Sequence, residues 1–267
     1  MVDLGKKNVL GVMINAIDYD ATLDTIFRAA REKRSCIVSA LAVHGVMTGV
    51  FDSEHKFRLN HFDVLVPDGQ PVRWVLNWLH STGLKDRVRG PSLTRQLCER
   101  AAAEGVPIYL YGSTAEVLSA MKQSLEADCP GIIIAGAEPS KFRRLTPDEK
   151  VELAAKIRNS GAGITLVGLG CPRQETFAFE FQDMLPMPLL TVGAAFPFMA
   201  GMIEEAPEWM GRVGLEWLFR LASEPQRLWK RYLYLNPAYL FLVTLQALGL
   251  SRFPTEGKVP ATESLFG

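Results

Sequence analysis

Asp68 is the side chain in this sequence that is best placed to do chemistry. It follows the short apolar run Val64–Val66 and lies in the turn Pro67-Asp68-Gly69, just before a predicted helix. Open α/β sheets bind ligands at the carboxyl ends of their strands, so an acid at this position predicts a general base that accepts a hydroxyl proton. Burial there would raise its pKa from about 3.9. The alternative is a turn aspartate that only satisfies backbone donors.

A second candidate turn lies in the segment ITLVGLGCPRQE, residues 164–175. Gly168 and Gly170 allow close backbone approach, and a helix that opens at Pro172 would aim N–H groups at a phosphate or sugar. Gln174 and Glu175 stand at the start of that helix as hydrogen-bonding groups. The third glycine of GxGxxG is missing, so this is not a dinucleotide fingerprint. The alternative is a tight turn that needs glycine for its geometry.

Three weaker signals accompany these turns. Gly112-Ser113 closes another predicted strand and suggests a further phosphate contact. Arg87 and Arg89, in the basic loop KDRVRGPS, could neutralise a diphosphate, although charged loops are commonly only solvated. His44 follows a strand near residue 41, where a capping or gap-filling role is the stronger alternative to catalysis.

The elements that must position these side chains alternate between strands and helices. Predicted strands cover residues 8–14, 35–41, 64–66, 107–111, 131–135, 163–167 and 188–192, with helices of ten or more residues between most of them. This order predicts an α/β fold with a mostly parallel, Rossmann-like sheet covered by helices on both faces, spanning residues 1–204.

The chain changes character at about residue 205. Residues 205–250 hold three of the five tryptophans and several basic side chains but no convincing strand. The final apolar run, 238–250, is shorter than the roughly 20 residues that cross a bilayer. We expect an amphipathic helical appendage that lies on a membrane surface, with a helical hairpin packed on the sheet as the alternative. Residues 251–267 are predicted to be a disordered tail.

Composition limits the classes of partner and compartment. Twenty-nine basic residues balance twenty-nine acidic ones, so no whole-molecule field would recruit nucleic acid. The four cysteines lie far apart, and the four histidines form no metal-ligand spacing with them. Residues 1–20 lack the features of a signal peptide. We therefore expect a reduced, cytosolic protein without a metal ion.

Taken together, these stretches resemble the WecG/TagA/CpsF family of bacterial glycosyltransferases over about residues 8–247. The similar segments are VPDGQPVRW, RVRGPSL, YLYGS, GLGCPRQE, VGAAFPFMAG and the Trp/Arg-rich stretch APEWMGRVGLEWLFRLASEPQRLWKRY. The resemblance implies an inverting, metal-independent transfer of a sugar from a UDP-sugar to a polyprenyl-diphosphate-linked sugar. The enzyme would act at the inner face of the cytoplasmic membrane and need no cofactor. The resemblance is also consistent with a homo-oligomer.

The resemblance also implies roles for individual residues. Asp68 matches the catalytic base. Arg220, Arg227 and Arg231 match arginines that close over the donor or hold the lipid diphosphate, and Arg212 and Lys230 add positive charge facing the membrane. The complete predicted set of donor- or acceptor-binding residues is Ser39, His44, Arg87, Gly112, Ser113, Gly136, Gly168, Gly170, Arg173, Gln174 and Glu175.

One segment departs from the family pattern. The family has Thr-x-Asn-x-Asp-His after its second strand, whereas this chain has Ser39-Ala40-Leu41-Ala42-Val43-His44. Leu41 and Val43 cannot make the polar contacts of Asn and Asp, which predicts a different donor or acceptor, or weakened catalysis. The rival hypothesis is a catalytically silent, membrane-attached binding or scaffold protein of a polysaccharide assembly system. A nicotinamide-dependent oxidoreductase is a weaker third.

Overall fold

The computed structural model describes the backbone of residues 1–267 and every side chain except those of Glu208, Arg212, Arg227, Lys230 and Arg231. At its centre is a six-stranded sheet in the order β4-β3-β8-β7-β5-β6, and every pair of neighbouring strands is parallel. This confirms the predicted α/β class. The strands are β3 (Cys36–Leu41), β4 (Val64–Pro67), β5 (Ile108–Gly112), β6 (Ile134–Glu138), β7 (Ile164–Gly168) and β8 (Pro188–Thr191).

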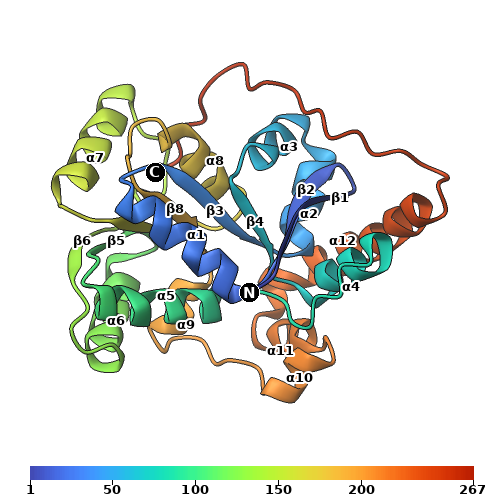
Figure 1. Cartoon of the computed structure of the whole chain (residues 1–267), viewed down its shortest axis with the longest axis horizontal. Coiled ribbons are helices and arrows are strands. Elements are labelled where there is room, and N and C mark those ends of the chain that lie inside the picture. The colour runs from blue at the N-terminus through green and yellow to red at the C-terminus, as the bar shows by residue number, and fades with distance from the viewer.

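Helices cover both faces of the sheet, as Figure 1 shows. One face packs on α1 (Tyr19–Arg31), α5 (Gly90–Glu104), α6 (Ala115–Asp128) and α9 (Ala195–Met199) through one buried apolar cluster. The other face packs on α2 (Val43–Phe51), α3 (Ser53–Asn60), α7 (Pro147–Asn159) and α8 (Arg173–Phe181) through a second cluster, which also receives side chains from α4 (Gln70–His80). Apolar residues on both sides of the strands explain why their sequences are continuously hydrophobic.

The amino-terminal strand prediction was only partly correct. Instead of one strand over residues 8–14, the chain forms an antiparallel hairpin of β1 (Asp3–Val9) and β2 (Val12–Ile17). The turn residues Leu10 and Gly11 have φ angles of 55° and 86°, so the run that looked continuous folds back on itself. The hairpin lies against β4, where the Asn15 side chain accepts a hydrogen bond from the Leu65 amide.

The strand predicted over residues 131–135 is displaced toward the carboxyl end. Gly131 adopts a positive φ of 89° and belongs to the preceding turn, and β6 begins only at Ile134. Gly136 therefore lies inside the edge strand, where a Cβ atom would approach the Tyr109 ring to 2.4 Å. The glycine gives room for packing against a neighbouring strand instead of closing the strand.

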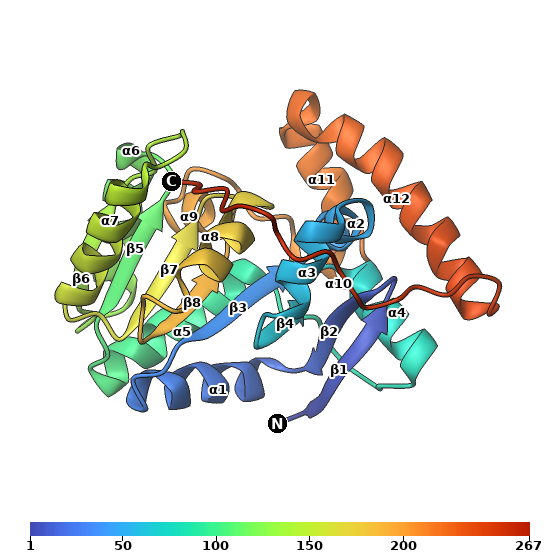
Figure 2. The ribbon, with the colours of Figure 1, turned by 90° about the horizontal axis from the view of Figure 1, so that it is seen from above.

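The carboxyl-terminal appendage is helical, as predicted. It contains α10 (Glu208–Arg212), α11 (Glu216–Ser223) and α12 (Pro225–Ala247), which lie to one side of the sheet beside α2 (Figure 2). Although a proline commonly breaks a helix, α12 continues through Pro237. Tyr239 and Val243 are each only 1% exposed, so α12 also contributes to the core. Among the described residues, no helix is long and apolar enough to cross a membrane.

Residues 251–267 differ from the predicted disordered tail. They run back across the molecule from α12 to the far side of the sheet (Figure 2). Their backbone is held by side chains and carbonyls of the body, including those of Asn60, Glu180 and Ser140. The sequence did not reveal these contacts, because hydrogen bonds from distant elements leave no periodic signal.

Candidate active site

The candidate site lies at the carboxyl edge of the sheet, next to the point where strand order reverses. After β3 the chain moves outward to β4, whereas β8, β7, β5 and β6 lie on the other side of β3. Such switch points leave a crevice outside the strand ends, which is where open α/β sheets bind ligands. The loops that follow β3, β4, β5, β7 and β8 all line a cavity here.

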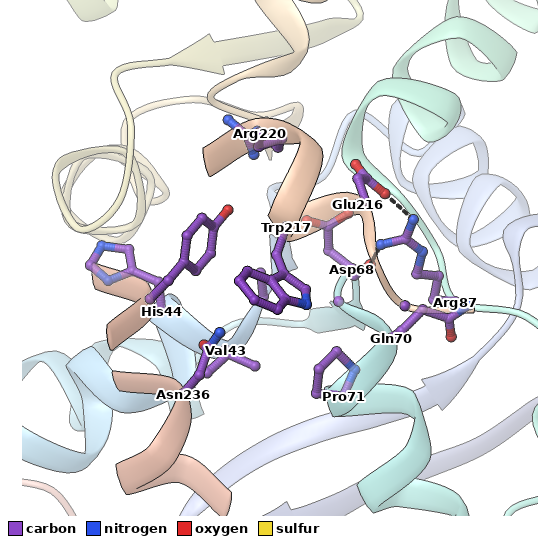
Figure 3. A pocket seen from close by; sticks show the side chains of 14 residues that line it. Val43, His44, Asp68, Gln70, Pro71, Arg87, Glu216, Trp217, Arg220 and Asn236 are labelled. Atoms are coloured by element: carbon purple, nitrogen blue, oxygen red, sulfur yellow. Dashed lines mark hydrogen bonds and ion pairs between the residues drawn. The ribbon is translucent and has the colours of Figure 1, made fainter. Parts of the chain in front are cut away.

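Two adjoining cavities meet at Asp68. The larger has a volume of about 490 Å³ and is bounded by the loops at the strand ends. The smaller has a volume of about 130 Å³ and lies between α4, the start of α2 and the appendage (Figure 3). Ala42, His44, Asp68, Glu216 and Arg220 line both of them. The larger volume falls in the usual range for small-molecule sites.

Asp68 is held in place by backbone groups from two segments. The Gly90 amide donates a hydrogen bond of 2.9 Å to Oδ1, and the Asp68 amide itself donates to the carbonyl of Leu41 at 3.2 Å. Burial raises the pKa of the Asp68 carboxyl above its ordinary value, while the Arg87 guanidinium and the Gly90 hydrogen bond oppose this shift. A fixed carboxylate with a raised pKa is a stronger base than a free aspartate.

Two loop arginines join the α/β body to the appendage through Glu216. Arg87 donates to Oε2 of Glu216 and, at 3.3 Å, to the carbonyl of Asp68, while Arg89 reaches Oε1 of Glu216 at 3.3 Å. Burial alone would raise the pKa of Glu216, but Arg87 and Arg89 hold it below its usual value. The dashed contact in Figure 3 places this ion pair beside Asp68. Arg87 thus contacts the backbone of Asp68 and links it to α11.

The glycine turn after β7 permits a close approach of neighbouring backbone and rings. A Cβ atom at Gly168 would lie 2.6 Å from the buried Phe196 ring, and one at Gly112 would lie 2.8 Å from the carbonyl carbon of Gly168. Gly170 has a φ of 77°, which favours glycine. The glycines therefore let this turn pack closely against Phe196 and the end of β5, while α8 directs its amino-terminal end toward the larger cavity.

A buried polar network supports this turn from behind. Oε1 of Glu175 accepts hydrogen bonds from the Ser39 hydroxyl at 3.0 Å and from Nε2 of Gln174 at 2.8 Å. Oε1 of Gln174 accepts from the Gly170 amide at 3.1 Å. Burial raises the pKa of the Glu175 carboxyl, although the hydrogen bonds from Ser39 and Gln174 act to lower it. Ser39 and Gln174 therefore connect β3 to the glycine turn through Glu175.

The structure brings most of the predicted residues to the two cavities. Gly112 and Ser39 lie immediately behind the wall, and Gly136 lies away from it in β6, which removes the reason to regard Gly136 as a binding residue. Arg212, Arg227, Lys230 and Arg231 lie outside the described side chains, so their roles stay predictions. The predicted residues that line a cavity are His44, Asp68, Arg87, Ser113, Gly168, Gly170, Arg173, Gln174, Glu175 and Arg220.

Sequence reasoning missed several residues of this site. Glu216 and Trp217 come from α11, and Gly193 follows β8, where a Cβ atom would lie 2.9 Å from Oε1 of Gln174. Gln70 donates to the carbonyl of Gly211 at 3.1 Å and so adds a contact between α4 and the appendage. The segment VGAAFPFMAG contained the signal for Gly193, but no local pattern could place Glu216 beside Arg87.

The departure from the family pattern has a clear location. Leu41 is 1% exposed and lines the larger cavity, whereas Val43 is 8% exposed and lines the smaller one. Each of these apolar side chains therefore lines a cavity that Asp68 also lines. His44, from the same segment, borders both cavities.

Comparison with known protein families gives one match that extends over nearly the whole fold. The model of the glycosyl transferase WecG/TagA/CpsF family matches residues 7–253 of the 267. The matched range includes the sheet, both cavities and the appendage. It confirms the resemblance seen in the sequence motifs and supports a glycosyltransferase role.

Proposed function

We propose, from the premise that this chain belongs to the WecG/TagA/CpsF family of glycosyltransferases, that it transfers a sugar from a UDP-sugar to a polyprenyl-diphosphate-linked sugar. The observation that carries this proposal is the position of Asp68 at the junction of two cavities. A transfer between two substrates needs a base where the acceptor hydroxyl meets the donor's anomeric carbon.

In this mechanism the larger cavity holds the UDP-sugar and the smaller one receives the acceptor sugar. Asp68 removes the proton of the acceptor hydroxyl as its oxygen bonds to the anomeric carbon, while the bond from that carbon to UDP breaks on the opposite side. The product has inverted configuration. Arg173 and Arg220 line the larger cavity and are suited to stabilise the departing diphosphate, with the α8 amino terminus.

The contacts of Arg87 favour a positioning role over the diphosphate contact predicted from the sequence. Its guanidinium is already occupied by Glu216 and the carbonyl of Asp68, and its side chain is only 11% exposed. A diphosphate would have to displace Glu216 to bind it. We therefore assign Arg87 to positioning the base and the appendage, and assign the charge of the leaving group to the arginines of the larger cavity.

The lipid part of the acceptor has a suitable path beside the smaller cavity. Pro71 lines that cavity and also a neighbouring apolar groove of about 180 Å³ between α4 and α12, bounded by Trp74, Trp78 and Leu240 among others. Trp78 is 60% exposed, and the neighbouring Phe241 is 64% exposed. Exposed aromatic side chains of this kind favour a membrane interface, so a prenyl chain could extend from the site into the bilayer.

A donor screen tests the function. Release of UDP should be measured for several UDP-sugars, with a polyprenyl-diphosphate sugar as acceptor, and at least one pair should turn over. Tight UDP binding without turnover on any pair would support the catalytically silent scaffold. That hypothesis rests on the apolar residues Leu41 and Val43.

Membrane attachment needs a separate test with point variants, because truncating α12 would expose the core around Tyr239 and Val243. Trp78→Ser with Phe241→Ser should reduce sedimentation with anionic vesicles. Val151→Ser on α7, which removes an equally exposed apolar side chain, is the matched control. Unchanged sedimentation of the double variant would place the membrane surface elsewhere.

A further inference from the structure

Three potential metal ligands meet beside the glycine turn, where Cys171 and Glu175 line the larger cavity. His55 comes from α3, Cys171 from the turn after β7, and Glu175 from the first turn of α8. One ligand atom from each lies within 4.8 Å of the others. The fold creates this group by packing α3 against α8 (Figure 1). His55 lies more than a hundred positions before Cys171 and Glu175, so the sequence spacing gave no indication of the cluster.

The polar atoms of His55 and Glu175 are buried and only partly satisfied. His55 is 1% exposed, and among the described residues neither of its ring nitrogens has a hydrogen-bond partner. Glu175 is also 1% exposed. Its Oε2 has no hydrogen-bond partner among the described residues, whereas its Oε1 accepts hydrogen bonds from Ser39 and Gln174. Buried polar groups are almost always paired, so both side chains point to a ligand that the protein itself does not supply.

The donor set identifies the chemical class of that ligand. An imidazole nitrogen, a thiolate sulfur and a carboxylate oxygen are typical ligands of Zn²⁺ and related borderline-soft metal ions, whereas Mg²⁺ and Ca²⁺ select oxygen. Bonds of about 2.0 to 2.3 Å to a tetrahedral ion place ligand atoms about 3.5 Å apart. The observed limit of 4.8 Å requires a contraction of about 1 Å, which side-chain rotations can supply.

The cluster is also accessible and already held in position. Cys171 and Glu175 line the larger cavity, which provides a route for an ion from solvent. The Ser39 and Gln174 hydrogen bonds fix one oxygen of the carboxylate, as outer contacts do in metal sites. The Cys171 sulfur lies within 4.8 Å of a carboxylate oxygen of Glu175, so the two ligands already stand close together.

We propose that His55, Cys171 and Glu175 form a binding site for a Zn²⁺-class metal ion, distinct from the transfer chemistry at Asp68. On binding, the Cys171 sulfur loses its proton to solvent and bonds to the ion, with no change of oxidation state. The ion would tie α3 to the turn 168–172 and so stiffen the wall of the donor cavity. This proposal goes beyond the glycosyltransferase function and does not require it.

Cobalt binding to the full-length protein tests the proposal directly. The chelator-treated wild type is titrated with Co²⁺ without any UDP-sugar, and Zn²⁺ is then added as a competitor. We expect one ion per chain, a thiolate-to-cobalt charge-transfer band in the near ultraviolet, and displacement by Zn²⁺ but not by Mg²⁺. Cys171→Ser should abolish the band, and His55→Gln should weaken binding at least about tenfold.

Two variants serve as matched controls. Cys129→Ser removes a buried thiol outside the cluster, and His61→Gln removes the exposed imidazole that follows α3, so both should bind Co²⁺ like the wild type. No band in the wild type, or a band that survives in Cys171→Ser, would overturn the proposal. If Cys171→Ser fails to fold by circular dichroism, His55→Gln decides: wild-type affinity in that variant overturns the site. None of these readouts depends on sugar transfer.

Discussion

Replacing Glu216 should loosen the appendage without unfolding the α/β body. In Glu216→Gln, Arg87 and Arg89 lose the carboxylate that joins them to α11. Breaking a fully buried ion pair costs roughly 3 to 5 kcal/mol. Glu216 and Arg87 are 17% and 11% exposed, and Arg87 keeps the carbonyl of Asp68, so we expect a smaller loss of about 2 kcal/mol.

The loss should be local, because the two apolar clusters of the body do not depend on Glu216. Hydrogen exchange followed by mass spectrometry should show about 30-fold faster exchange in residues 208–223, as about 2 kcal/mol implies. Glu149→Gln, which removes an ion-paired carboxylate on α7, is the matched control and should leave this segment unchanged. Wild-type exchange in Glu216→Gln would refute the view that these ion pairs hold the appendage to the body.

Three further predictions concern the cavities. Arg220→Gln should weaken UDP binding about 10- to 150-fold in calorimetry, because it removes a charged hydrogen bond worth roughly 1.5 to 3 kcal/mol; an unchanged Kd would exclude Arg220 from the donor site. Gly168→Ala should lower the free energy of unfolding by about 1 to 3 kcal/mol in urea, since its Cβ meets the buried Phe196 ring, and equal stability would show that the ring moves freely. Asp68→Asn should gain stability over the wild type as pH rises. The folded state raises the pKa of this carboxyl, so its contribution is complete below the unfolded value of about 3.9 and is lost as pH rises through the folded value. Urea titrations at pH 4 and pH 7 should show that difference, and a difference independent of pH would contradict it.

The sequence could predict the parts of the fold that local patterns determine. Continuous apolar runs located β3, β4, β5, β7 and β8, and the glycines and acids at their ends identified Asp68 and the turn at Gly168 and Gly170. Parallel strands end at one edge, so these residues had to converge. The prediction of Gly136 failed because β6 starts later than its apolar run, which moves the glycine from the strand end into the ladder.

Long-range pairing was not predictable from a single sequence. The contact of Glu216 with Arg87, separated by 129 positions, depends on how the appendage docks, and no periodicity records it. The same holds for the tail, whose backbone bonds to Glu180 depend on where α8 ends. The cluster of His55, Cys171 and Glu175 exists only because α3 packs on α8.

The apolar residues beside Asp68 raise the question of whether they change substrate choice or the rate of transfer. Leu41 and Val43 replace the polar residues of the family pattern, yet the carboxylate of Asp68 keeps its backbone support from Gly90. We therefore expect these residues to change which substrate is accepted, while the Asp68 carboxylate stays in position. A donor screen that finds no turnover would point instead to lost catalysis.

The most direct test of the account is the transfer rate of Asp68→Asn with the donor and acceptor pair that the screen identifies. A positioned base contributes about 10²- to 10⁴-fold, so kcat should fall by that factor while the Kd for UDP stays close to the wild-type value. The amide retains the shape of the side chain but cannot accept the proton. A variant that transfers sugar within tenfold of the wild-type rate would contradict the assignment of Asp68 as the base.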